Sequence, residues 1–227
     1  MLFQKNHQIE EIAGNLYFLV SCRSIFQRAG FHLIVYEHQG QTLFILLNTR
    51  KVEDWKERAE KAVNDITQLY DREKPGEAVI NYGIGSYCEQ FQYMRKSFQA
   101  AKEVLHLKKV MPQRIKSPFY QDLHMLRLMP VMKESGLLEC MVKEYLEPVI
   151  LYDKQNSGRL YQTLNIFLQT NGSKKETASQ LYIVRQTLYH RLDKLHALLG
   201  GDMMQAPKRQ ALEFAILAYE FLQGNRH

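Results

Sequence analysis

Residues 172–199 constrain the fold of this chain more than any other stretch. Their spacing predicts two helices, at about 174–181 and 185–199, joined by residues 182–184 alone. A connection this short does not reverse the chain fully, and it is typical of the turn in a helix-turn-helix. Small and apolar residues recur where the two helices would close on each other, at Ala178, Leu181, Ile183, Leu188 and Leu192.

The start of the first predicted helix carries its own signal. Ser173 is followed three residues later by Glu176, which is the spacing of a capping box. Lys174 and Lys175 come directly after the capping residue. We therefore expect Ser173, the two lysines and nearby main-chain N–H groups to hold phosphates.

The second predicted helix is rich in side chains that bond to base edges or phosphates. They are Arg185, Gln186, Thr187, Tyr189, His190, Arg191 and Lys194. The N-terminal turns of such a helix enter the major groove, which favours the first five of these as base-facing residues. Arg191 falls where a helix-turn-helix often has an inward residue, so it either contacts DNA or pairs with an acid such as Glu176.

A second interpretation fits the same pattern. Amphipathic helix pairs are common, and Lys and Arg on a helix usually form a solvated face. The pair could then bind a partner protein, in a non-enzymatic ligand-sensing or protein-interaction module. Charge favours DNA, because residues 172–201 hold five Lys or Arg against two acids and the whole chain has a net charge of +6 with a pI near 9.1.

Motifs for catalysis and metal binding are absent from the sequence. It contains no CxxC, no HExxH, no Cys/His cluster and no glycine elbow around a serine. We therefore expect no enzyme activity, no metal and no cofactor. The apolar runs are of strand length and residues 1–11 lack the apolar run of a signal peptide, so we expect a cytoplasmic protein with no membrane partner.

The first half of the chain alternates between strand and helix patterns. Aromatic and branched runs predict strands at 16–20, 31–36, 42–47 and 78–85. The polar residues 37–41 predict a hairpin between the second and third of them. Apolar residues spaced by three and four predict helices at 53–70, ended by Lys74-Pro75-Gly76, and at about 91–105. This order indicates an α+β fold, a small antiparallel or mixed sheet with helices covering one face.

The second half reads as helices throughout. Residues 110–118, with two prolines and several basic residues, predict a linker, so the expected domains are 1–112 and 113–227. Expected helix ends are Gly136, Glu147-Pro148, Asn171-Gly172 and Gly200-Gly201, with a turn at 153–158. The second domain is then all-α and contains the helix-turn-helix at 173–199.

Several motifs in this half occur together and in order. They are TL-x2-FL from Thr163, NGS from Asn171, TA-x2-L from Thr177, R-x-TLYHRL from Arg185 and LLG from Leu198. This set resembles the C-terminal helix-turn-helix domain of the PucR/CdaR family of bacterial transcription regulators. Upstream, Gly83-Ile84-Gly85 and Arg95-x-Ser97-Phe98-x-x-Ala101 resemble the end of the degenerate GGDEF-like domain that precedes it in that family.

The resemblance implies a sequence-specific transcription regulator that binds double-stranded DNA as a homodimer. Members usually carry a further N-terminal sensing domain, so we expect a fragment or a short member, with any small-molecule effector bound by a domain absent here. Cyclase activity is not expected, because two-metal phosphoryl chemistry needs several carboxylates and Glu37 is the only one between Leu16 and Arg50.

Overall fold

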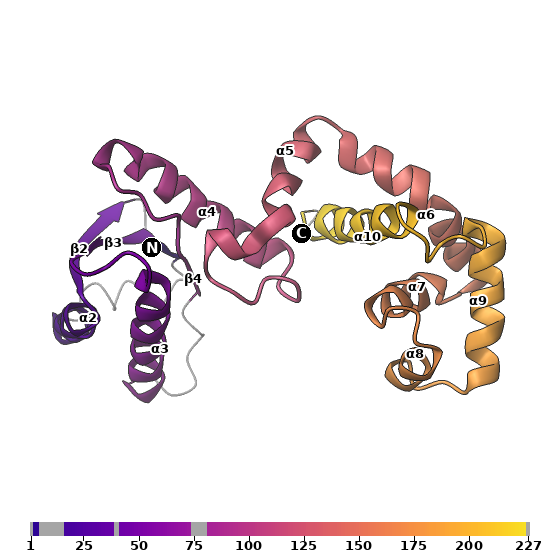
Figure 1. The fold of residues 1–227 in the computed structure, drawn as a ribbon, viewed down its shortest axis with the longest axis horizontal. Coiled ribbons are helices and arrows are strands. Elements are labelled where there is room, and N and C mark those ends of the chain that lie inside the picture. Colours follow the sequence, from indigo (N-terminus) through magenta and orange to yellow (C-terminus); the bar gives the residue numbers. More distant parts are fainter. Residues whose placement is uncertain (1, 5–15, 39–40, 74–80, 226–227) are drawn as a thin grey trace. The chain divides into compact units, whose positions relative to one another are not determined.

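A computed structural model of the chain describes residues 2–4, 16–38, 41–73 and 81–225 (Figure 1). By internal contacts the chain divides into two compact units, Met1–Arg127 and Leu128–His227. The first unit combines a sheet with helices, and the second is built from helices. The expected α+β class with a helical second domain is confirmed. None of the helices in the described ranges is long and apolar enough to cross a membrane.

The first unit is organised around a four-stranded sheet. Its strands are β1 (Leu2–Gln4), β2 (Phe31–His38), β3 (Gln41–Asn48) and β4 (Asn81–Gly83), in the order β2-β3-β1-β4. The expected hairpin is confirmed, since β2 and β3 pair antiparallel from Phe31↔Asn48 to His38↔Gln41. Strand β1 was not expected, and it pairs antiparallel with both β3 and β4. Residues 39–40, 74–76 and 78–80 of the expected hairpin loop, helix stop and last strand lie outside the described residues.

Helices cover both faces of this sheet, not one as the sequence suggested. On one face α2 (Leu16–Arg28) and α3 (Trp55–Glu73) enclose the core that includes Phe26, Phe44 and Ile66. On the other face α4 (Met94–Val110), which follows a short 3-10 turn η1 (Phe91–Tyr93), packs through Ala101 and Leu105 against Leu43 of β3. Figure 1 shows α4 on the side of the sheet opposite α2 and α3.

The strand expected at 16–20 is wrong, because these residues begin helix α2. The run LYFLV is short and apolar throughout, so its periodicity does not separate a strand from a buried helix. The residues that follow position 20 show that this segment is a helix. Phe18, Cys22 and Phe26 recur every four residues, all are buried, and one helical face therefore enters the core.

The two glycines at the end of β4 allow α4 to approach the sheet closely. A Cβ placed on Gly83 would lie 2.4 Å from the Ala101 carbonyl oxygen, and one on Gly85 would lie 1.9 Å from the Ser97 carbonyl oxygen. Both obstacles are main-chain atoms of a helix, which cannot rotate away as a side chain can. The Gly83-Ile84-Gly85 motif therefore serves helix packing at this site.

The segment expected to be a linker is tied to the first unit instead. The Ile84 N–H donates to the Pro118 carbonyl (2.7 Å) and the Tyr120 N–H donates to the Ile84 carbonyl (2.9 Å). Phe119 between them is 1% exposed and belongs to the sheet core. The 3-10 segment η2 (Tyr120–Leu128) follows. The division of the chain consequently falls after residue 127, later than the expected boundary at 112, because an apolar anchor follows the prolines.

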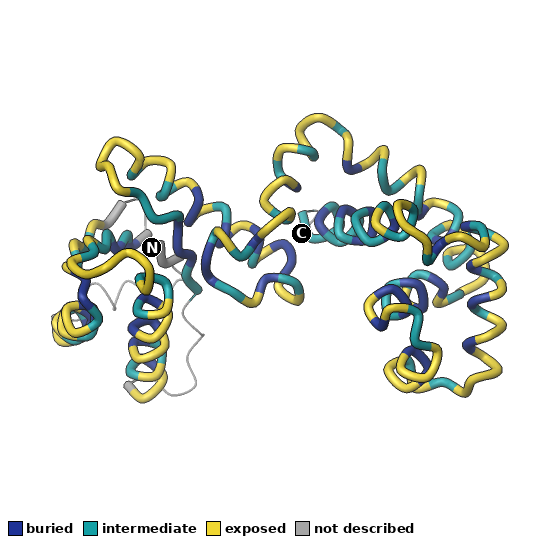
Figure 2. The backbone as a smooth tube through the Cα atoms, viewed as in Figure 1, coloured by how far each residue is buried: buried dark blue, intermediate teal, exposed yellow. Residues whose placement is uncertain are grey.

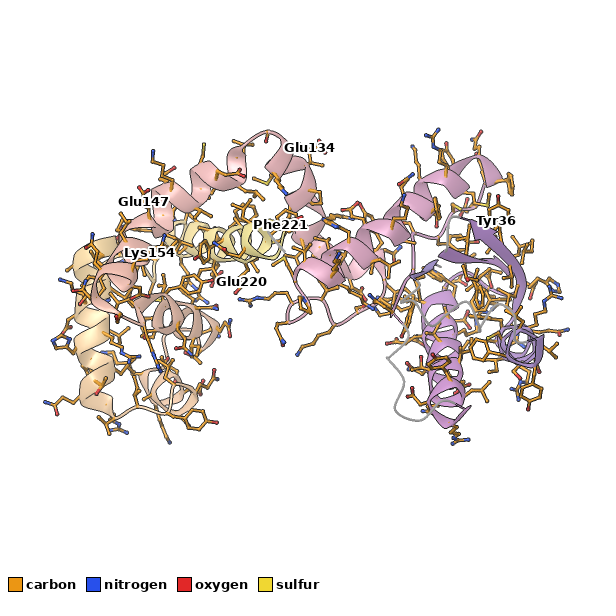
Figure 3. All side chains as sticks on the ribbon, turned by 180° about the vertical axis from the view of Figure 1, so that it is seen from behind. Tyr36, Glu134, Glu147, Lys154, Glu220 and Phe221 are labelled. Atoms are coloured by element: carbon orange, nitrogen blue, oxygen red, sulfur yellow. The ribbon has the colours of Figure 1, made fainter. Side chains whose placement is uncertain are left out.

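The second unit comprises α5 (Met129–Glu134), α6 (Leu137–Asn156), α7 (Leu160–Gln169), α8 (Lys174–Gln180), α9 (Arg185–Leu199) and α10 (Lys208–Gly224). Helix α10 packs along α6 (Figure 1). Phe221 on α10 is buried, and its neighbour Glu220 accepts a hydrogen bond from the Asn165 amide of α7 at 3.4 Å; both α10 residues are labelled in Figure 3.

The expected helix end at Glu147-Pro148 is wrong, because α6 continues to Asn156. Proline inside a helix removes one backbone hydrogen bond and favours a break. Here Leu146 and Val149, on either side of Pro148, are both fully buried in the core of the second unit. Burial of this face outweighs the local preference, so the turn expected from residue 153 starts only at Ser157, which is left-handed.

Replacing Gly85 by alanine tests the close approach of α4. The Gly85→Ala variant should lose about 2–3 kcal/mol of unfolding free energy, since its methyl group would overlap a fixed carbonyl. Urea unfolding followed by the fluorescence of Trp55, the single tryptophan, reports on this unit. The neighbouring Ser86→Ala change adds no Cβ and should stay within about 0.5 kcal/mol of the native chain. Equal stability of the two variants would contradict this account of the glycine.

Candidate nucleic-acid interface

The residues between α7 and α8 set the angle at which the chain enters the helix pair. Asn171 (φ 51°) and Gly172 (φ 80°) are left-handed, and the Gly172 N–H returns to the Phe167 carbonyl at 2.9 Å, which ends α7 as expected. The Ser173 hydroxyl then accepts the Glu176 N–H at 3.4 Å and caps α8. The capping box is only half formed, because the Ser173 N–H donates to the Thr170 carbonyl.

A buried pair of threonines joins α7 to α8. The hydroxyl oxygens of Thr170 and Thr177 lie 2.8 Å apart, and both side chains are buried. Thr177 also donates to the Ser173 carbonyl at 2.8 Å. Because buried hydroxyls need partners, this contact favours one arrangement of the two helices.

The turn between α8 and α9 is a Schellman motif built without glycine. The Tyr182 N–H donates to the Ser179 carbonyl and the Ile183 N–H to the Ala178 carbonyl. Tyr182 itself has φ 54°, a left-handed value that is costly for a residue with a Cβ. Its side chain is 96% exposed and Val184 is 69% exposed, so packing does not compensate the strain.

Helix α9 buries one face and exposes the other. Its leucine stripe, Leu188, Leu192, Leu195 and Leu199, is buried against the core of the second unit. The opposite side is exposed and carries the expected polar residues of the first two turns, Arg185, Gln186, Thr187, Tyr189 and His190. Figure 2 shows this alternation along α9, with buried positions between exposed ones. Gln186 and His190 are four residues apart, so they lie one above the other on the solvent side.

The basic side chains of this region differ in their contacts. Lys174 Nζ lies 4.5 Å from the ring centroid of Tyr189, so α8 and α9 share a cation–π contact at the edge of the exposed face. Lys175 is exposed. Lys194 is half-buried, with its Nζ 5.1 Å from the ring centroid of Tyr152 on α6.

Arg191 takes the inward position that the sequence left open. Its guanidinium donates to the Thr163 hydroxyl of α7 at 3.2 Å, and the side chain is only partly exposed. The expected ion pair with Glu176 is not the contact that forms, because Arg191 lies on the α7 side of α9 whereas Glu176 belongs to the first turn of α8. Arg191 therefore joins α9 to α7.

Two exposed apolar residues were missed as candidates. The sequence pattern identified Tyr182 and Val184 only as part of the turn. Both lie just before the N-terminal end of α9, where its exposed polar face begins. A sequence signal was available, since a turn that needs a left-handed residue carries tyrosine where glycine or asparagine is preferred. Strain retained at an exposed aromatic residue is a common mark of a functional position.

This geometry defines a helix-turn-helix domain: α8 and α9 joined by a tight turn, with α7 supporting both. Comparison with known proteins agrees, because residues 160–218 match the family model of the PucR C-terminal helix-turn-helix domain. That match extends from the start of α7 into α10.

Two bacterial regulators are similar to the chain over a longer stretch. It is 24% identical over 188 residues to the purine catabolism regulatory protein of Bacillus subtilis (strain 168), covering 78% of this chain and 33% of that protein. It is 26% identical over 165 residues to the carbohydrate diacid regulator of Escherichia coli (strain K12), covering 72% of this chain and 40% of that protein. The chain thus spans about a third to two fifths of the length of these relatives.

The strain at Tyr182 can be measured directly. Tyr182→Gly should raise the local unfolding free energy of α9 by about 0.5–1 kcal/mol, because glycine adopts positive φ without a Cβ clash. Native-state hydrogen exchange of the α9 amides would report it. Tyr182→Ala keeps the Cβ and loses only an exposed ring, so it should change little. Equal protection in both variants would mean that the left-handed backbone at this position is not strained.

Proposed function

We propose that the chain is a sequence-specific DNA-binding transcription regulator of the PucR/CdaR type. The observation that carries the proposal is the helix-turn-helix match over residues 160–218 combined with the exposed polar face of α9. The two similar proteins are both named as regulators, which supports the same conclusion. The sequence contains none of the catalytic motifs considered above, so it gives no reason to prefer an enzyme.

In the proposed complex the N-terminal turns of α9 enter the major groove. Gln186 and His190 form the centre of the exposed face, and a glutamine side chain can make two hydrogen bonds to adenine there. Arg185 and Thr187 flank them. Tyr182 and Val184, exposed at the entering end, offer apolar contact to a thymine methyl group.

Backbone phosphates would be held from α8. Lys174 and Lys175 follow the Ser173 cap, and the Ser173 hydroxyl is already used by the Glu176 N–H. Lys174 lies over the Tyr189 ring and so is held next to the groove-facing side of α9. Lys175 is exposed and available to a phosphate. These contacts would set the register of the protein on DNA without selecting its sequence.

The remaining parts of the proposal concern the whole protein. One helix-turn-helix reads only a few base pairs, so we infer that it acts as a homodimer on a two-part site. The first unit would then serve dimerisation or signal relay as a degenerate GGDEF-like domain without cyclase activity. We infer a cytoplasmic location, where a regulator meets its DNA.

Fluorescence anisotropy tests the proposal, with a labelled fragment of the gene's own upstream region and a scrambled duplex. We expect tight binding to the native fragment that weakens steeply with salt, because phosphate contacts release counterions. An apolar protein contact would not show this dependence. A folded dimer that binds neither duplex at low salt would instead indicate that Tyr182, Val184 and Tyr189 form a surface for a partner protein.

Two variants separate base reading from phosphate binding. Gln186→Ala should weaken binding to the native fragment by about 1–3 kcal/mol and leave the scrambled duplex nearly unchanged. Lys175→Ala is the matching phosphate variant. It should lose the same binding affinity on both duplexes, and its affinity should depend less steeply on salt concentration. Equal loss on both duplexes for Gln186→Ala would remove Gln186 from the base-reading set, and an unchanged slope would remove Lys175 from the phosphate contacts.

A further inference from the structure

A small basic pocket lies beside the exposed face of α9. It has a volume of about 220 Å³ and is bounded by the end of α6, the start of α7 and the middle of α9. Its polar lining consists of Arg159, His190, Arg191 and Lys194, with the Ser157 hydroxyl and the Tyr152 ring at the α6 end. Four basic or titratable side chains therefore line a space that is large enough to admit a small anion.

No carboxylate lines this pocket among the residues that the structure describes. Two acids are adjacent in sequence to lining residues. Asp193, beside Lys194, is exposed and does not line the pocket, and Asp153, beside Tyr152, is already occupied. Its Oδ1 accepts the Leu160 N–H at 2.8 Å and its Oδ2 accepts the Tyr161 N–H at 2.9 Å, so it caps α7 with both oxygens. Gly158 makes room for this cap, since a Cβ there would lie 2.5 Å from Asp153 Oδ1. The positive charge of the pocket consequently has no counter-charge among the residues that line it.

The walls of the pocket are held by specific contacts. Arg191 donates to the Thr163 hydroxyl at 3.2 Å, and that hydroxyl donates to the Arg159 carbonyl at 2.8 Å. Thr163 is fully buried, so this chain fixes the backbone of Arg159 relative to α9. Lys194 is positioned by the Tyr152 ring at 5.1 Å. By contrast, the side chains of Arg159 and His190 make no ion pair with any other described residue.

We propose that this pocket binds a phosphate group of the DNA backbone, on the strand beside the groove that α9 enters. His190 belongs both to the pocket and to the exposed face of α9, one turn after Gln186, which places the bound phosphate next to the base-reading residues. Arg159 and Lys194 supply the charge-assisted hydrogen bonds, and Arg191 holds the wall through Thr163. Arg159 thereby becomes a DNA contact contributed by α7, outside the helix-turn-helix itself.

The proposal rests on the proposed function, because it assigns a second phosphate contact to the same DNA complex. The chemistry it requires is that of a phosphate oxygen with negative charge. A free phosphate or a phosphorylated small molecule has the same chemistry, so the test must separate these sources from duplex DNA.

The DNA arm compares Arg159→Gln and Lys194→Gln with the native chain in the anisotropy assay. Each variant should bind about tenfold more weakly to native and scrambled duplexes alike. The slope of log affinity against log salt should become shallower by about 0.9 for each lost contact. Lys143→Gln on α6 is the matched control, because it removes the same charge from an exposed lysine outside the pocket and should change neither quantity. Arg159→Lys should recover part of the affinity lost in Arg159→Gln, and circular dichroism verifies that each variant is folded.

The outcomes distinguish the proposal from the function on which it rests. Native-like affinity and salt slope in both variants, with a native chain that binds DNA, would overturn the pocket and leave the DNA-binding function standing. Loss on the native fragment alone would also overturn it, since that pattern belongs to base reading. If the native chain bound neither duplex, both the function and the pocket assignment would fail.

The second arm titrates inorganic phosphate into the DNA-free protein and follows the His190 ring by NMR. Shifts that saturate in the native chain and disappear in Arg159→Gln would support a phosphate pocket. The same shifts combined with unaltered DNA binding in the variants would overturn the DNA assignment, because the pocket would then serve a free anion.

Discussion

Burial of the leucine stripe on α9 is the interaction on which the second unit depends. Leu188 and Leu195 are completely inaccessible, and the removal of each leucine side chain from water contributes about 2 kcal/mol. A helix of this kind has one apolar face, so burying it against the core leaves the other face in solvent. The polar residues of α9 are therefore presented outward as a consequence of packing.

Polar contacts then determine how the neighbouring helices are placed around α9. The Thr170–Thr177 hydroxyl contact joins α7 to α8, and the Arg191–Thr163 hydrogen bond joins α7 to α9. Apolar packing tolerates small shifts, whereas a buried hydroxyl or guanidinium without its partner is costly. These contacts therefore orient the exposed face, while the leucines supply most of the stability.

Sequence reasoning succeeded where the signals were local. The hairpin of β2 and β3, the stop at Asn171-Gly172 and the cap at Ser173 depend on residues within a few positions of one another. It failed where burial of a side chain against residues distant in the sequence outweighed a local conformational preference. Pro148 did not end α6, the prolines before Phe119 did not separate the units, and residues 16–20 joined a helix because Cys22 and Phe26 continue its buried face.

The sequence by itself determined that a short turn joins two amphipathic helices, and which residues of α9 are apolar, because helical periodicity is written in the spacing of side chains. Only the tertiary structure decided which contacts each basic residue makes. Arg191 and Lys194 are close in sequence, yet one bonds to buried Thr163 and the other lies over Tyr152 at the pocket. Arg159, with no motif of its own, is brought beside His190 by the packing of α7 on α9. Contacts between separate helices depend on how their faces meet, and no spacing within one helix encodes that.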